Sequence, residues 1–204
     1  MKESKEIIFN EISNESLKPR IGGMSFLPED MDWPENPDGE KLVVILSLPT
    51  DFLKSNFGLN YPEDTVVSVF TTYNQNDFFL DKIVYHGDDS ELEHIRSGFT
   101  KVLLHQIGKP RNDAEYIIPA QEVIVGGPIG TEEYTGSKIG GNPSFLQNED
   151  YSLLDEYLFC LQLYGSDYHE EYKDIFYLTD SIGYLYLNPN TDENNAGVFF
   201  TQST

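Results

Sequence analysis

The sequence has few basic residues, a single cysteine and no long apolar run. Its 204 residues contain 13 Lys and Arg against 35 Asp and Glu, which gives a formal net charge of −22. Proteins that bind a nucleic-acid backbone or an anionic membrane need a cationic face, so the sequence predicts neither kind of partner. No apolar stretch approaches the roughly 18 residues of a membrane-spanning helix, and the charged N-terminus shows no signal peptide, which together predict a cytoplasmic protein.

The sequence also lacks recognisable catalytic motifs. It has no Gly-x-Ser-x-Gly elbow and no phosphate loop, so we expect neither an enzyme nor a cofactor. The histidine- and acid-rich segment 86–94 is typical of a solvated loop and helix start, and no metal site is predicted there. The lone Cys160 lies in an apolar run, which predicts an inert, buried thiol.

What the sequence does contain is a pattern that occurs twice. A basic residue followed by Ile-Gly-Gly is found at 20–23 and again at 138–141. A Phe-Leu pair and two apolar runs follow each copy in the same order and at nearly constant spacing. The pattern predicts two repeats, about 18–77 and 136–195, joined by a segment 78–135. Two unrelated β meanders that share Gly-rich turns are the alternative.

The apolar runs are short, rich in β-branched and aromatic residues, and bounded by turn residues. They predict an α+β fold that is mostly β, with internally duplicated antiparallel sheets and a few short helices. Runs 66–70 and 184–187 are apolar on both faces, which favours central strands. Further strands are expected at 83–85, 116–118, 122–125 and 198–200.

Two helices are expected. Residues 1–17 are predicted to form an N-terminal helix, because Ile7, Ile8 and Ile12 fall within one stripe and Pro19 follows. Ser90, with Glu93 at the capping-box position, predicts the start of a second helix. Residues 18–204 are then expected to form a single domain built from the two repeats.

The paired glycines have two interpretations. They form either tight turns without a ligand or backbone nests for an anion, with the preceding basic residue supplying charge. The candidate ligand-binding residues are Arg20, Gly22, Gly23, Lys138, Gly140 and Gly141.

These blocks resemble a known family. Residues 21–28 with Trp33-Pro34 are similar to the Ile-Gly-Gly-x-x-x-Leu-Pro and Trp-Pro elements of the YwqG-like family of uncharacterised bacterial proteins. Residues 137–147 are similar to its Gly-Gly-x-Pro-x-x-x-Gln signature. The resemblance implies a duplicated, β-rich fold and no established activity. Some members are expected beside toxin genes, which suggests an immunity role by analogy.

Acidic residues concentrate toward the C-terminus. Residues 149–204 contain 11 acids and one base, Lys173, with tyrosines interleaved. Such a region favours capture of a basic protein partner, although simple solubility also explains it. The candidate contact residues are Asp155, Glu156, Tyr164, Asp167, Tyr168, Glu170, Glu171, Tyr172 and Asp174.

The sequence therefore predicts a non-enzymatic, acidic binding protein. Its expected role is that of an immunity-type inhibitor that occludes a basic surface of a cognate bacterial toxin or effector. The alternative is a small-ligand or metal-binding protein whose site lies between the two repeats, near Arg20 and Lys138.

Overall fold

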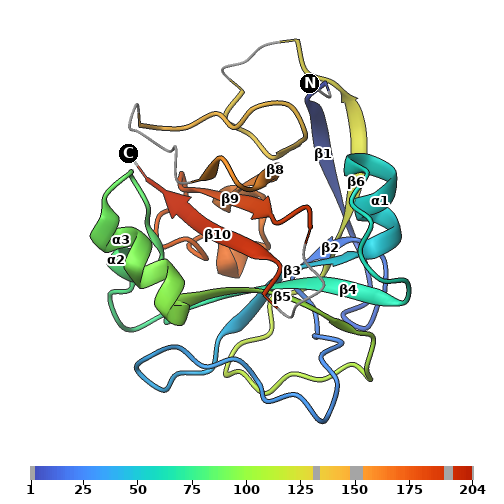
Figure 1. Ribbon diagram of the computed structural model, residues 1–204. Coiled ribbons are helices and arrows are strands. Elements are labelled where there is room, and N and C mark those ends of the chain that lie inside the picture. Colours follow the sequence, from blue (N-terminus) through green and yellow to red (C-terminus); the bar gives the residue numbers. More distant parts are fainter. Residues whose placement is uncertain (1–2, 131–133, 148–153, 191–194, 204) are drawn as a thin grey trace.

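The computed structural model describes residues 3–130, 134–147, 154–190 and 195–203, and its main feature is one sheet of ten strands (Figure 1). The strand order is β10-β9-β8-β7-β1-β6-β2-β3-β4-β5, and each pairing between these strands is antiparallel. The strands are β1 (Lys5–Glu11), β2 (Arg20–Ile21), β3 (Val43–Pro49), β4 (Thr65–Thr71), β5 (Thr100–Gln106), β6 (Gln121–Pro128), β7 (Lys138–Ile139), β8 (Leu158–Tyr164), β9 (Ile182–Leu187) and β10 (Gly197–Gln202). The mostly β, antiparallel fold predicted from the sequence is thus confirmed.

The sheet is nearly closed, because its two end strands approach each other. Leu103 of β5 forms an isolated bridge with Asn195. The Thr100 hydroxyl donates to the Phe199 carbonyl at 2.6 Å. These few contacts join β5 to β10 without a continuous ladder.

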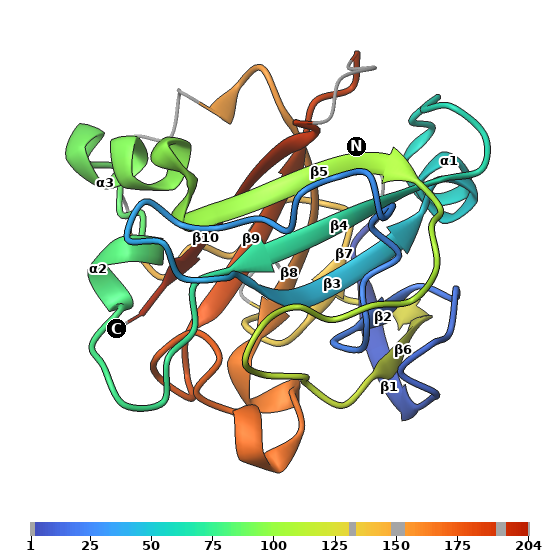
Figure 2. The ribbon, with the colours of Figure 1, turned by 90° about the horizontal axis from the view of Figure 1, so that it is seen from below.

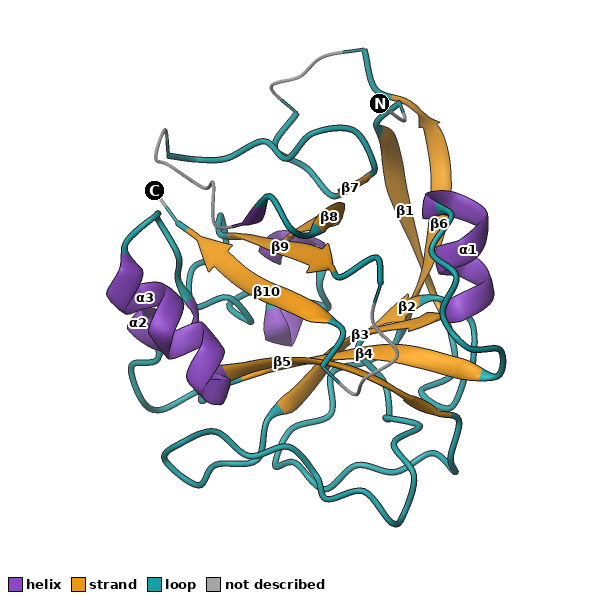
Figure 3. Ribbon diagram, in the orientation of Figure 1, coloured by secondary structure: helices purple, strands orange, loops and turns teal. Residues whose placement is uncertain are grey.

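Short helices lie around the sheet (Figure 3). They are α1 (Thr50–Phe57), α2 (Leu80–Ile83), α3 (Asp89–His94), a π-type turn η1 (Ile95–Phe99), and the 3₁₀ turns η3 (Gly165–Asp167) and η4 (Glu170–Tyr172). The predicted helix near Ser90 is present, but its cap is Asp88, whose side chain accepts the Ser90 N–H at 2.7 Å. No helix in the described ranges is both long enough and apolar enough to cross a bilayer.

The predicted N-terminal helix over residues 1–17 is wrong, because Lys5–Glu11 form strand β1. Side chains alternate there: Ile7 is 6% exposed and belongs to the core, whereas Ile8 is 45% exposed. β1 pairs with β6 on one side and with β7 on the other. Pairing with distant strands overrides a periodicity that three isoleucines in a short segment define only weakly.

The core is divided between the inside of the sheet and two outer clusters. The inner cluster includes Cys160, which is fully buried in β8 as the sequence predicts. Leu92 and Ile95 of the helical segment pack on the outer face of β9 and β10. Leu27 and Trp33 pack on the outer face of β3 and β4. Two regions of the outer face are therefore covered: the helical segment that precedes β5 lies over β9 and β10, and the segment that follows the first Gly-Gly turn lies over β3 and β4.

The strand order is symmetric about the central β1–β6 pair. Strands β2 to β5, from the N-terminal half of the chain, lie on one side of this pair, and β7 to β10, from the C-terminal half, lie on the other. The turns also correspond: Gly22 N–H donates to the Ile45 carbonyl at 2.9 Å, and Gly140 N–H donates to the Cys160 carbonyl at 2.8 Å. A register shift occurs at Ile45 in β3 and at Cys160 in β8. These correspondences support an internal duplication, which itself stays a prediction.

Candidate binding surface

Arg20, a candidate ligand-binding residue, is completely buried. Its Nε donates to the Ser16 carbonyl at 2.7 Å, and its two terminal nitrogens donate to the carbonyls of Gly22 and Met24. Burial lowers the pKa of Arg20 to about 10. The guanidinium therefore holds the first Gly-Gly turn from within and does not present its charge to solvent.

Lys138, its counterpart in the second half, is also buried. Its ammonium donates to the Ser144 hydroxyl at 2.6 Å, and the Ser144 N–H donates to the Gln162 side-chain carbonyl at 2.9 Å. Arg20 and Lys138 thus both have hydrogen-bond partners inside the fold.

The glycines of both turns are required by their backbone. Gly22, Gly23, Gly140 and Gly141 have φ values of 62°, 79°, 72° and 66°, in the left-handed region that disfavours other residues. A Cβ at Gly22 would also lie 2.7 Å from the Ile118 carbonyl oxygen. The structure thus places the six candidate ligand-binding residues in two turns of the sheet framework, where all of them are buried except the partly exposed Gly141.

The predicted acidic contact residues do not form one surface. Asp155 and Glu156 are exposed before the start of β8, whereas Tyr164 is half-buried at its end. Seven residues of extended strand separate these positions by about 20 Å. Asp155 and Glu156 therefore lie apart from the segment 167–174.

Tyr168 is not available to a partner, which corrects its prediction as a contact residue. Its side chain is 2% exposed, and its hydroxyl donates to the Ile45 carbonyl at 3.1 Å. Burial raises the pKa of Tyr168 well above its usual value. Its aromatic ring is drawn into the core because η3 turns the chain back over the inside of the sheet.

Three acidic residues of the segment 167–174 have partners within the protein: Asp167, Glu170 and Asp174. The Asp167 carboxylate accepts the Ser137 hydroxyl at 2.6 Å. Glu170 pairs with Lys173 at 2.7 Å, and the hydrogen bond from Lys173 lowers the pKa of the Glu170 carboxyl. The exposed carboxylates of Glu171 and Asp174 and the half-buried ring of Tyr172 remain as contact candidates.

Tyr73, two residues after the end of β4, connects these residues to the first half of the chain. Its ring centroid lies 5.1 Å from that of Tyr116 and 5.8 Å from that of Tyr172. Its hydroxyl donates to Asp174 Oδ1 at 2.9 Å, and burial, with the nearby Asp174, raises the pKa of Tyr73. Figure 2 shows the segment 165–180 beside the segment 107–120, as these contacts require.

Aromatic side chains extend from Tyr73 to the molecular surface. Phe78 is 53% exposed and packs edge-on against Tyr177, with centroids 5.0 Å apart. Exposed carboxylates lie in the same three segments as these rings. We define the tyrosine face as the buried Tyr73 with the more exposed Phe78, Tyr116, Tyr172 and Tyr177 around it, together with the carboxylates Asp77, Glu115, Glu171 and Asp174.

A hollow lies beside this face. It is a cavity of about 420 Å³ next to Tyr73 and Tyr116. Among the residues that the structure describes, its lining includes the carboxylates of Glu40, Asp113 and Glu115 and one cation, Lys41. A cationic side chain of a partner would meet excess negative charge there. Sequence reasoning missed Tyr73, Phe78 and Tyr116, because the face is assembled from three segments that lie far apart in the chain.

One pair of side chains has the composition of a nucleophile and a base. His105 Nδ1 donates to the Gln106 carbonyl at 2.8 Å, so its Nε2, 2.9 Å from Ser68 Oγ, accepts the serine hydroxyl. Both residues are buried, and burial lowers the pKa of His105. A substrate has no access to Ser68 in this position, so the pair is best explained as a hydrogen bond between β4 and β5.

Metal-ligand types do not converge in the part of the chain that the structure describes, where no three His, Cys, Asp or Glu side chains form a group suited to an ion. In the segment 86–94, the Glu91 carboxylate instead accepts the His86 N–H at 2.6 Å. That contact and the Asp88 cap account for local order at the start of α3.

Comparison with curated proteins finds no match to this chain. A family model does match, over residues 19–180, and it covers both Gly-Gly turns and the strands β2 to β8. The chain therefore belongs to the family described as Domain of unknown function (DUF1963).

Proposed function

We propose that the protein is a non-enzymatic acidic binding protein that covers a basic surface of a protein partner with its tyrosine face. The observation that carries the proposal is the exposed Phe78, which packs on Tyr177 and is accompanied by carboxylates from three segments. The buried rings of Phe79 and Tyr73 connect this pair to Tyr116 and Tyr172. Aromatic side chains supply most of the binding energy in many interfaces, and surrounding charges steer a partner of opposite sign.

Solubility alone explains part of this surface. Exposed carboxylates keep any acidic protein soluble. Solubility gives no reason for aromatic rings from separate segments to gather beside those carboxylates and to extend to a half-exposed phenylalanine. A site for a cationic partner accounts for both features.

The proposed partner is a bacterial toxin or effector, and the proposed action is occlusion of its basic surface inside the cytoplasm. Support for this finer assignment comes from the net charge of −22 and from the resemblance to the YwqG-like family, in which an immunity role is suggested by analogy. An inhibitor of this kind needs no catalytic group, since binding alone excludes the target's substrate.

The test uses the product of the adjacent gene as the partner. Calorimetry measures its dissociation constant at about 50 mM and about 300 mM NaCl, a change that shortens the screening length by a factor of about 2.5. A triple variant, Asp77→Asn with Glu115→Gln and Glu171→Gln, removes three charges from the tyrosine face. Phe78→Ala separately removes the aromatic anchor.

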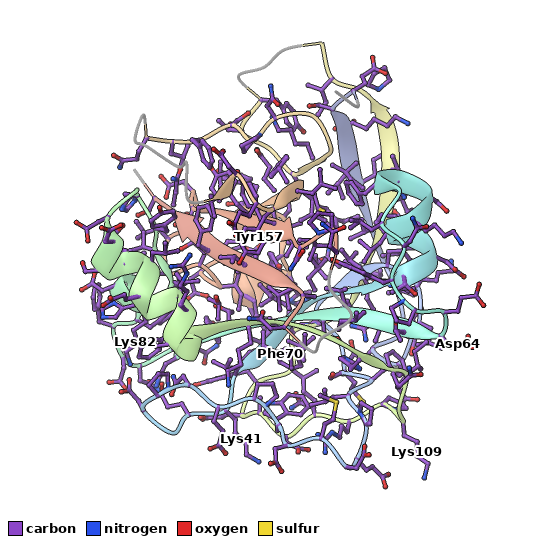
Figure 4. All side chains as sticks on the ribbon, in the orientation of Figure 1. Lys41, Asp64, Phe70, Lys82, Lys109 and Tyr157 are labelled. Carbon is purple, nitrogen blue, oxygen red and sulfur yellow. The ribbon has the colours of Figure 1, made fainter. Side chains whose placement is uncertain are left out.

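A matched control removes the same number of charges elsewhere. Asp51, Glu63 and Asp64 are exposed near α1 and the start of β4, about 20 Å from Tyr73 at the other end of that strand. Figure 4 places Asp64 on the opposite side of the molecule from Lys82, which follows the Tyr73–Leu80 segment.

We expect the face variants to weaken binding about tenfold or more and Asp51→Asn/Glu63→Gln/Asp64→Asn to weaken it by less than about threefold. Wild-type affinity should fall as salt rises. Equal losses in both triple variants would contradict the assignment of the tyrosine face. A neighbouring gene product that does not bind would contradict the immunity role.

A further inference from the structure

We infer that the seam between β5 and β10 is a binding site for a small organic anion with an apolar body. A cavity of about 420 Å³ lies there, lined by residues of η1, β5 and β10. Cavities of a few hundred Å³ are of the size that encloses small molecules. This inference does not depend on the tyrosine face or on the proposed partner.

The cavity exists because the sheet is incompletely closed. β5 and β10 end the strand order. In the part of the chain that the structure describes, they are joined by the Leu103–Asn195 bridge, by the Ala196 N–H, which donates to the Val102 carbonyl at 2.8 Å, and by the Thr100–Phe199 hydrogen bond. The seam also separates the last strand of the first half from the last strand of the second. β5 and β10 lie outside the two predicted repeats, 18–77 and 136–195, so this site differs in place and in residues from the alternative predicted from the sequence.

The charge of the cavity lining is opposite to that of the molecule. Arg96 and Lys101 line the cavity, and no carboxylate does so among the described residues. Arg96 is exposed at the mouth, and Lys101 is half-buried on β5. In a chain with 35 acids and 13 bases, a lining whose charged side chains, among those described, are both cations favours an anion.

Neither cation is neutralised within the described part of the chain. Lys82 and Lys173 form ion pairs with carboxylates at 2.6 Å and 2.7 Å, whereas Arg96 and Lys101 form none there. The backbone makes room for Lys101: Gly98 has φ 112°, and a Cβ at this position would lie 2.9 Å from Lys101 Cε. A guanidinium fork and an ammonium on one cavity are suited to a carboxylate or a phosphate.

Part of the remaining lining is apolar. The half-buried side chains of Leu103 and Tyr157 contribute hydrocarbon surface, with the buried Ile95 and Val198 beside them, and Thr100 adds a hydroxyl that donates to the Phe199 carbonyl. An inorganic anion would leave that apolar surface without a partner, and a neutral hydrocarbon would leave the two cations without one. The ligand class that satisfies both is an amphipathic anion with a short aliphatic or aromatic body.

The test compares four probes that share an eight-carbon chain: octanoate, octyl phosphate, 1-octanol and octylammonium. Calorimetry on the full chain measures their dissociation constants, and methyl NMR shifts of Val102 and Val198 report whether binding occurs at the seam. We expect at least one anion to bind about tenfold or more tightly than 1-octanol, and octylammonium to bind most weakly. The ratio between octanoate and octyl phosphate distinguishes a carboxylate site from a phosphate site.

The double variant Arg96→Gln/Lys101→Gln should weaken anion binding about tenfold or more. The control variant Lys5→Gln/Lys54→Gln changes the net charge by the same amount away from the cavity, and its affinity for the anion should stay within about twofold of the wild-type value. Thermal unfolding of each variant without ligand checks that the fold persists, and Arg96→Lys tests the guanidinium without loss of charge if the double variant unfolds. Equal affinity for octanoate and 1-octanol, or unchanged affinity in the double variant, would overturn the inference. Absence of binding by both anions would overturn it as well.

Discussion

At the scale of single residues, the buried cation Arg20 determines the shape of the first Gly-Gly turn. Its three side-chain nitrogens donate hydrogen bonds to the backbone carbonyls of Ser16, Gly22 and Met24. Removing the guanidinium leaves these acceptors without their donor, and each buried acceptor left unpaired costs about 1–3 kcal/mol. The role of Arg20 is thus structural, and its size can be measured.

The variant Arg20→Met keeps the apolar stem and removes every donor. We expect its free energy of unfolding in urea to fall by about 3 kcal/mol or more. Arg20→Lys, which retains a charge but not the planar fork, should restore only part of this loss. Lys18→Met, at an exposed position that forms a surface ion pair with Glu122, should change stability by less than about 1 kcal/mol. An Arg20→Met protein as stable as wild type would show that the turn does not need the guanidinium.

At the scale of elements, β1 joins the two halves of the sheet. It belongs to the start of the chain, yet it pairs with β6 and β7, while β6 pairs in turn with β2. Because the alternation of a strand separates Ile7 from Ile8, truncation of these two neighbours should have unequal effects. In the predicted helix, both would have faced the core.

Ile7→Ala should lower the free energy of unfolding by about 2–4 kcal/mol, since it creates a cavity in the main core. Ile8→Ala should lower it by less than about 1 kcal/mol, because that side chain is nearly half exposed. Urea unfolding of the two variants provides the comparison. Similar losses at both positions would be incompatible with the strand.

Predictions from sequence succeeded where a strand is defined by its own residues. The runs 66–70, 184–187, 122–125 and 198–200 lie in β4, β9, β6 and β10. They failed where distant partners decide the outcome: 116–118 is not a strand, and 83–85 contains the end of α2 and a single bridge at Val84. The tyrosine face belongs to the second kind, because Tyr73, Tyr116 and Tyr172 meet only after the sheet has formed.

At the scale of the whole molecule, the positions of the few cations determine where the surface can bind a cationic partner and where it can bind an anion. Arg20 and Lys138 are buried, so the surface is more negative than the net charge alone indicates. Arg96 and Lys101 lie together at the seam between β5 and β10. The aromatic residues gather instead beside carboxylates, at the end of β4. The molecule therefore presents two chemically different regions, one suited to a cationic protein and one to a small anion.

Backbone amide NMR with a decalysine peptide as titrant tests the tyrosine face most directly, at about 50 mM and about 300 mM NaCl. The account predicts that the largest chemical-shift changes cluster in residues 73–78, 115–117 and 171–178, and that they shrink at the higher salt concentration. Changes of equal size over all exposed acidic segments, or a maximum at residues 51–64, would contradict it.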